Sequence, residues 1–400
     1  MPSTHLSRPG YLHRLLSWFQ ISHISAGFIA VLVGYTSSAA IIFQAAQAAG
    51  ASTAELGSWM WSLGIGLGLL SAGLSLRYKI PILTAWSTPG AALLVTGLAG
   101  LPMSQAIGIF LFSSLLTTIC GLSGSFQKLM QYMPRSIAGA MLGGILLRFG
   151  LDLFGAMQTQ WLMCLGMFVV FLLVRQWSAR YAVPLALLAG LALASAQGLL
   201  KMEILSWTPA TPVLVWPEFS WTALIGVGIP FFIVTMSSQN IPGVAVLKAH
   251  NYDAPNSTVI SWTGIIGLIF GPFGGYAYNL AAISAALCMT PEVDADPRQR
   301  YRASVWAGIF YFAAGIFGAT VVSLFAAFPT ELIAAIAGLA LLGTIGNSIH
   351  MALETPDTRD AALVTFLTTA SGMSLLNIGS AFWGLVFGMA IYLIQKRKAS

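Results

Sequence analysis

Residues 80–94 read IPILTAWSTPGAALL, and residues 271–284 read GPFGGYAYNLAAIS. Both stretches are apolar enough to lie inside a bilayer, yet both carry Pro, Gly and polar residues in the middle. A Pro inside a helix removes a backbone donor and clashes with the preceding turn, so neither stretch is expected to form one straight helix. Irregular backbone at membrane depth is tolerated only where protein or a water-filled cavity covers it. Two such segments at matching places in two halves of a chain indicate the binding site of a transporter.

The composition is that of a membrane protein. Of the 400 residues, 57% are hydrophobic and 8% are charged, whereas soluble domains carry roughly 25% charged residues. Cys120, Cys164 and Cys288 lie within or beside apolar segments without a CxxC pair, so they predict packing residues and neither disulfides nor a metal site. We therefore expect a polytopic helical membrane protein without a cofactor.

Apolar segments of the length that spans a bilayer, about 20 residues, follow one another along the chain. We predict fourteen of them, at residues 21–47, 56–76, 80–98, 104–125, 134–152, 159–175, 182–200, 220–240, 257–272, 275–289, 303–327, 331–350, 360–376 and 379–395. The more polar stretch 201–219 separates the first seven from the last seven.

The cationic residues fit this topology when the N-terminus is placed in the cytoplasm. The cytoplasmic side then receives Arg8, Arg14, Arg77, Lys79, Lys128, Arg135, Arg175, Arg180, Lys248, Arg298, Arg300, Arg302, Arg359, Lys396, Arg397 and Lys398. Only Arg148 and Lys201 fall on the other side. This asymmetry follows the positive-inside rule, so the net charge of +6 needs no nucleic-acid partner to explain it, and both termini are expected in the cytoplasm.

Seven segments followed by seven predict an inverted repeat, because an odd repeat turns over in the membrane when it is duplicated. Segment three then corresponds to segment ten, and these are the two interrupted segments. In segment three, residues 83–86 are expected to be extended, and Ser87 and Thr88 are good N-caps before Pro89, which is favoured in the first helical turn. A short helix from about residue 89 to 98 should follow.

In segment ten, residues 274–278 are expected to be extended, and Asn279 is expected to cap a helix that runs to about residue 289. Two half-helices would then begin near mid-membrane with free backbone N–H groups, which is an anion site without a cationic side chain. The alternative is that Gly and Pro in these segments only allow close helix packing.

Further polar residues lie inside predicted spans. Gln239 and Asn240, at the end of segment eight, predict either hydrogen bonds to a substrate or contacts between helices, because an unpaired buried amide is costly. His23, early in segment one, predicts a proton relay or a structural hydrogen bond. Arg148 and Asp152 are spaced to pair on one helix. No carboxylate falls in the middle of a span, which disfavours a pump or a cation channel, and no catalytic motif indicates an enzyme.

The strings TAWSTPGAALL at 84–94, SQNIPGVAVL at 238–247 and GPFGG at 271–275 resemble the benzoate membrane transporter family of the BenE type, over essentially the whole chain. The resemblance implies a proton-coupled importer of benzoate in the bacterial inner membrane. It also implies kinship with nucleobase–cation symporters and sulfate-type anion transporters, which share a fourteen-span, seven-plus-seven fold with short strands in spans three and ten. Related folds are often dimers, which implies a homodimer here, although no motif shows it.

The same resemblance divides the chain into two domains. A core domain would contain residues 1–126 and 220–328, a gate domain would contain residues 127–200 and 329–400, and residues 201–219 would link the two repeats. The chain departs from the nucleobase symporters at two positions, because those proteins place a Glu where this chain has Gln239 and another around Tyr278. They also carry a His in the first span, and His23 sits at a comparable place. Losing both carboxylates suits a substrate that brings its own negative charge.

These observations predict a secondary transporter for a small aromatic carboxylate, most simply benzoate. The carboxylate would rest at Ser87–Thr88 and Asn279–Leu280, and either His23 would take part in proton coupling or the acid would cross protonated. The expected substrate-binding residues are Trp86, Ser87, Thr88, Gln239, Asn240, Tyr276, Tyr278, Asn279, Leu280 and Phe28. Two alternatives remain open, a nucleobase–proton symporter and an anion channel of the same fold.

Overall fold

A computed structural model describes residues 18–125, 134–376 and 378–399. Arg8, Arg14 and Lys128 of the predicted cytoplasmic cations therefore lie outside the described residues. The elements of the first half are α2 (Ile21–Ala48), α3 (Thr53–Tyr78), β1 (Thr84–Ala85), α4 (Thr88–Gly97), α5 (Met103–Leu122), α7 (Arg135–Thr159), α8 (Trp161–Trp177) and α9 (Ala179–Ala196).

The second half starts after a short 3-10 turn, η1 (Met202–Ile204), in the linker. Its elements are α10 (Trp221–Ala223), η2 (Leu224–Gly228), α11 (Ile229–Thr235), η3 (Met236–Asn240), α12 (Ile241–Ala249), α13 (Asn256–Phe270), η4 (Gly271–Phe273), β2 (Asn279–Leu280), α14 (Ile283–Ala286), α15 (Tyr301–Ile316), α16 (Gly318–Ala326), α17 (Thr330–Leu353), η5 (Pro356–Thr358), α18 (Arg359–Ala370), β3 (Ser374–Leu375), β4 (Ile378–Gly379) and α19 (Ser380–Ala399).

Local sequence explains several boundaries. Helix α3 begins with a capping box, in which Ser52 Oγ accepts from the Glu55 N–H and the Glu55 carboxylate accepts from the Ser52 N–H. The run from α10 to α12 is one 29-residue helix with π-helical turns at η2 and η3. Pro230 and Pro242 each stand at the second position after one of these turns. Because Pro has no N–H and its ring crowds the preceding turn, a widened turn accommodates it.

Five of the described helices are long and apolar enough to cross a membrane, and the number reaches seven if each of two bent pairs counts as one span. One of these pairs is α15 and α16, which bend by 67° where a single segment, 303–327, is predicted. Shorter apolar helices include α8. The fold is that of a helical membrane protein, and the count of fourteen spans stays a prediction.

The packing of the helices relates the two halves. Helix α3 packs against α15, and α13 packs against α5. These are predicted segments 2 with 11 and 9 with 4, so exchanging the halves turns one pair into the other. Helices α7 and α17, from segments 5 and 12, form a pair that maps onto itself, as do β1 and β2 in segments 3 and 10. Contacts that are preserved by this exchange are the mark of a duplicated fold.

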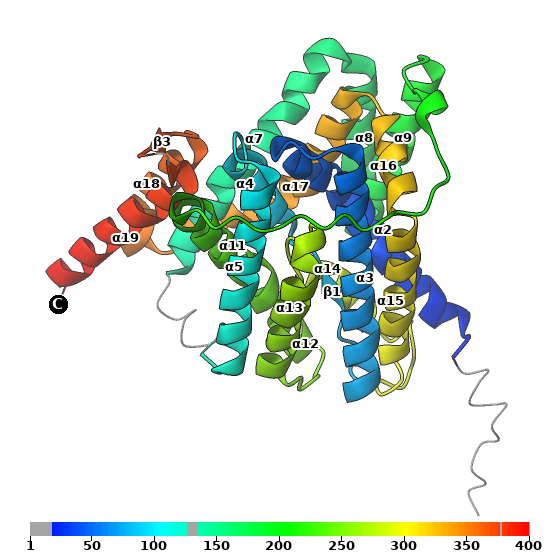
Figure 1. The fold of residues 1–400 in the computed structure, drawn as a ribbon, viewed down its shortest axis with the longest axis horizontal. Helices are drawn as coiled ribbons and strands as arrows, with labels where there is room; N and C mark the ends of the chain where they lie inside the picture. Colours follow the sequence, from blue (N-terminus) through cyan, green and yellow to red (C-terminus); the bar gives the residue numbers. More distant parts are fainter. Residues whose placement is uncertain (1–17, 126–133, 377, 400) are drawn as a thin grey trace, which may run out of the picture.

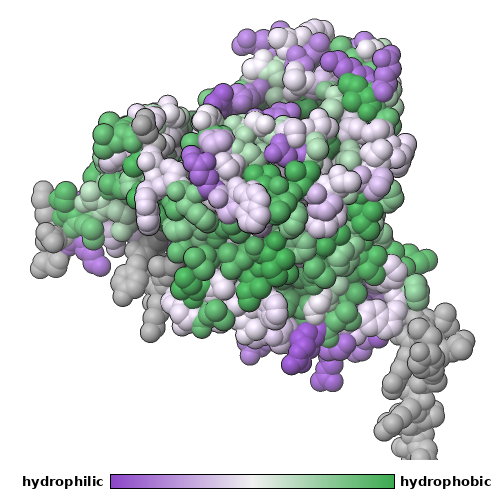
Figure 2. All heavy atoms as spheres, viewed as in Figure 1, coloured by the Kyte–Doolittle hydropathy of each residue, from purple (hydrophilic) through white to green (hydrophobic). Residues whose placement is uncertain are grey.

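The linker between the halves is extended and crosses one face of the helices (Figure 1). Its backbone N–H groups at Lys201, Ala210, Val215 and Glu218 donate to carbonyls of Ala327, Ile316, Pro272 and Ser104. These bonds tie the linker to the helices without regular secondary structure. Figure 2 shows apolar residues across the middle of the same face, with hydrophilic residues gathered above and below them, as expected for a bilayer band.

Candidate functional site: the junction of β1 and β2

The two interrupted segments meet as a two-stranded antiparallel pair. Thr84 lies opposite Leu280, Ala85 lies opposite Asn279, and the Ala281 N–H donates to the Leu83 carbonyl. The pair is fixed from behind by α3, because Ser71 Oγ bonds to both the N–H and the hydroxyl of Thr84. Pro and Gly break the helix in these segments, so their backbone N–H and C=O groups lack helical partners. Strand pairing supplies partners for some of these groups inside the membrane.

The start of α4 agrees with the sequence prediction. Ser87 is the N-cap, its Oγ accepts from the Gly90 N–H at 2.9 Å, and Pro89 stands in the first turn. Because Pro89 has no N–H and the Gly90 N–H is capped, the Thr88 N–H is the donor that the first turn can offer to an anion. The Thr88 hydroxyl bonds to Ser38 Oγ of α2.

The predicted half-helix of segment ten is wrong in its start and its length. Asn279 lies in β2, and the helix that follows, α14, has four residues and no side-chain cap. Asn279 continues the extended backbone because its main chain pairs with Ala85. Its side-chain oxygen accepts a hydrogen bond from Asn240 of η3, so it does not cap a helix. The expected cradle of N–H groups at Asn279–Leu280 therefore does not form.

A pair of amides replaces that cradle. Asn240 Nδ2 donates to Asn279 Oδ1 at 3.0 Å, and Asn240 Oδ1 accepts from the Leu280 N–H at 3.0 Å. Both side chains are buried, at 0% and 3% exposure. Asn279 Nδ2 is buried and has no hydrogen-bond partner among the described residues. The neighbouring Gln239 is half-buried and shares the π-helical turn η3 with Asn240, a feature frequent at functional sites.

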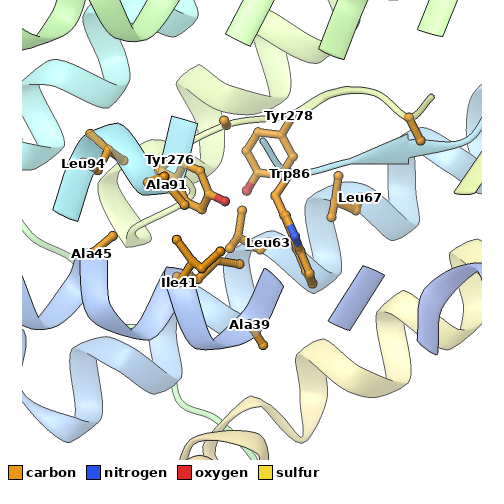
Figure 3. Close-up of a cluster of buried hydrophobic side chains, with 14 of the residues drawn as sticks. Ala39, Ile41, Ala45, Leu63, Leu67, Trp86, Ala91, Leu94, Tyr276 and Tyr278 are labelled. Atoms are coloured by element: carbon orange, nitrogen blue, oxygen red, sulfur yellow. The ribbon is translucent and has the colours of Figure 1, made fainter. Parts of the chain in front are cut away.

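Figure 3 shows Trp86, Tyr276 and Tyr278 in one buried cluster, but their hydrogen bonds and contacts differ. Trp86 and Tyr276 lie at the junction, and the Tyr276 hydroxyl donates to the Ser87 carbonyl at 3.2 Å. The Tyr278 hydroxyl instead donates to Ser62 of α3, so its ring packs into the core. Phe28 does not join them, because its side chain is 48% exposed and it contacts Phe310 on the outer surface.

His23 lies apart from the junction. Its Nε2 bonds to Asp294 Oδ2 at 2.9 Å, with the His side chain fully buried and Asp294 16% exposed. A cavity of about 210 Å³ adjoins this pair and is lined by residues that include Ser22, Ser25 and Thr290. Tyr35, which lies at the junction as described below, is on the same helix α2. At 1.5 Å per residue, it is roughly 18 Å from His23 along the helix axis. The sequence analysis missed Asp294 because it lies in a polar loop outside every predicted span.

Two further residues were missed at the junction. Tyr35 of α2 and Tyr311 of α15 surround the Trp86 indole, with ring centroids 4.7 and 6.1 Å away. Tyr35 belongs to the run GYTSS at 34–38, and that polar interruption of an apolar segment was the available signal. Tyr311 lies in a longer apolar run that carries no such signal. The predicted pair Arg148 and Asp152 is 4.0 Å apart and exposed, so it belongs to the surface.

All side chains named at the junction are uncharged, and the described residues hold no cluster of His, Cys, Asp or Glu that could bind a metal ion. The arrangement offers amide, hydroxyl and backbone N–H donors beside an indole, buried from water. Such a set can bind the carboxylate and the ring of a small aromatic acid, because donors in a low-dielectric site favour an anion without a cation.

Known proteins resemble this chain in sequence and in fold. The chain is 49% identical to the inner membrane protein YdcO of Escherichia coli, over 92% of this chain and 94% of that protein. It is 38% identical to the benzoate membrane transport protein of Acinetobacter baylyi, over 96% and 97% of the two chains. In fold it resembles SLC26A9, with a TM-score of 0.60, 15% identity and 96% and 67% of the chains covered.

It also resembles the transmembrane domain of the cyanobacterial bicarbonate transporter BicA, with a TM-score of 0.59, 15% identity and 94% and 96% covered. At such low identity these structures support the fold alone. The family model described as benzoate membrane transport protein matches residues 17–394, and that family contains transporters and not enzymes. This chain therefore belongs to the benzoate membrane transport protein family.

Proposed function

We propose that this chain is a secondary transporter that imports a small aromatic carboxylate, benzoate first among them, by proton symport with alternating access. The observation that carries the proposal is the buried Asn279 Nδ2, which has no partner among the described residues and lies on the strand that pairs with the residue before Trp86. A carboxylate oxygen would satisfy this donor and the Thr88 N–H, and the ring would lie against Trp86.

Alternating access requires two bodies that move relative to each other. We assign residues 1–126 and 220–328 to a core and residues 127–200 and 329–400 to a gate. The packing of α3 on α15 and of α13 on α5 within the core, and of α17 and α18 on α7 within the gate, supports this division. The linker 201–219 bonds only to core elements in the contacts given above, so it would move with the core. We place the chain in the bacterial inner membrane with both termini in the cytoplasm.

Uptake into proteoliposomes tests the substrate. Labelled benzoate should enter protein-containing vesicles faster than protein-free ones, faster still with an inward proton gradient, and at an unchanged rate when uracil is in excess. The protein-free vesicles are essential because benzoic acid crosses bilayers unaided. Competition by uracil would favour the nucleobase symporter, and benzoate currents far above carrier turnover would favour the anion channel. Uptake equal to the protein-free rate would reject the benzoate assignment.

Proton coupling is tested at His23. The change His23→Gln keeps a hydrogen-bond donor for Asp294 but removes the group that can take up a proton. We expect the variant to exchange labelled for unlabelled benzoate at the normal rate and to lose the stimulation by a proton gradient. His350→Gln, at an exposed position of α17, is the matched control. Normal stimulation in His23→Gln would mean that the acid crosses protonated or that another group carries the proton.

A further inference from the structure

Two tyrosine hydroxyl groups, those of Tyr35 and Tyr311, belong to rings that contact Trp86. They are distinct from the donors assigned to the carboxylate. Tyr35 and Tyr311 stand 6.3 Å from each other, measured between ring centroids, and both contact the indole. A Cβ built on Gly34 would lie 3.5 Å from the Tyr311 hydroxyl oxygen, so this hydroxyl reaches across from α15 to the backbone of α2. The two phenol rings therefore come from different helices to the same indole.

Neither hydroxyl has a hydrogen-bond partner within the described ranges, and both oxygen atoms are buried. Other buried tyrosines of this chain are satisfied: the hydroxyls of Tyr276, Tyr278 and Tyr252 each donate to a backbone carbonyl. A buried hydroxyl without a partner is costly, because the hydrogen bonds that it makes to water in the unfolded chain are not replaced. Two such hydroxyls on rings that contact Trp86 indicate that a bound molecule supplies the missing partners.

Benzoate cannot be that molecule at both points. It carries one polar group, which the proposed function places at Thr88 and Asn279, and its bare ring would leave the two phenols unpaired. A second carboxylate on the ring is disfavoured because it would bury a second negative charge close to the first, which raises the cost of desolvation. A ring hydroxyl fits, because it can donate to one phenol and accept from the other.

We propose that Tyr35 and Tyr311 recognise a hydroxyl group on the substrate ring, so that this chain selects hydroxylated aromatic carboxylates over benzoate. The inference rests on the proposed function, since it uses the same site and the same carboxylate. Sites built to hydrogen-bond a substrate hydroxyl discriminate strongly against the analogue that lacks it, because their own polar groups are then left unpaired.

The test compares dissociation constants of benzoate and of 2-, 3- and 4-hydroxybenzoate for the purified full-length protein by isothermal titration calorimetry. One positional isomer should bind about 30-fold more tightly than benzoate, as two added hydrogen bonds of about 1 kcal/mol each predict. Tyr35→Phe and Tyr311→Phe should each cut this preference to about fivefold, the value that the one remaining hydrogen bond predicts. Tyr252→Phe, which removes a hydroxyl bonded to Pro297 in a loop, should keep the full preference.

The outcomes separate the two proposals. If benzoate binds and all three isomers bind no more tightly, the phenols are satisfied by water and the ring-hydroxyl assignment is wrong, while the aromatic carboxylate function stands. The same conclusion follows if the preference exists but survives in both Phe variants. If neither benzoate nor any isomer binds, the proposed function fails and this inference fails with it.

Discussion

Replacing Asn279 by Asp should weaken benzoate binding by about 10- to 100-fold, the largest functional effect that we expect from one substitution. Asp keeps the oxygen that accepts from Asn240 Nδ2 and nearly the same volume, so the junction should stay folded. It removes the unpartnered Nδ2 donor and places a negative charge where the carboxylate would bind. A hydrogen bond to a charged group contributes roughly 1.5–3 kcal/mol, and each 1.4 kcal/mol changes affinity about tenfold.

Two variants control for indirect effects. Asn279→Ala removes the donor without adding charge, so its affinity should lie between those of wild type and Asn279→Asp. Asn347→Ala, at an exposed position of α17, should bind benzoate as wild type does. Dissociation constants and thermal melting should be measured on the same preparations. A well-folded Asn279→Asp protein with wild-type affinity would remove Asn279 from the binding site.

The sequence predicted a helical membrane protein because membrane constraints leave clear patterns. The apolar segments give the helices, and Pro and Gly within residues 80–94 and 271–284 mark where helical backbone must break. The start of α4 was also predictable, since capping by Ser87 depends on residues three positions apart. Helix capping can be predicted from sequence because it depends only on residues that are close together in the chain.

The site itself was predicted only in part, because its contacts join distant segments. Asn279 was expected to cap a helix, and its observed role depends on Ala85 and Asn240, neither of which is near it in the sequence. Phe28 was expected in the ring pocket because of its type, but the rotation of α2 that turns it outward is set by packing against α15. Tyr311 was not predicted because its apolar surroundings in the sequence do not reveal its contact with Trp86.

Gly274→Ala should cause the largest loss of stability among the substitutions considered. Gly274 follows η4 with φ of +92°, in the left-handed region where a side chain costs about 1–2 kcal/mol. A Cβ built there would also overlap the indole of Trp59, which is 1% exposed and packs against Phe110. Such overpacking adds about 1–3 kcal/mol, because the ring has no free space to move into.

A substitution at Gly100 serves as the control, because it distinguishes the cost of a positive φ from the cost of overlap with Trp59. Gly100 has φ of +80°, and a Cβ built there meets no atom within 4 Å, so Gly100→Ala should carry only the backbone cost. In thermal melts of the detergent-solubilised protein, Gly274→Ala should therefore lower the melting temperature by about twice as much as Gly100→Ala or more. Equal shifts would mean that Trp59 does not press on Gly274. A larger shift at Gly274 would show that the break in segment ten is stabilised by close packing of Trp59 as well as by the strand pair.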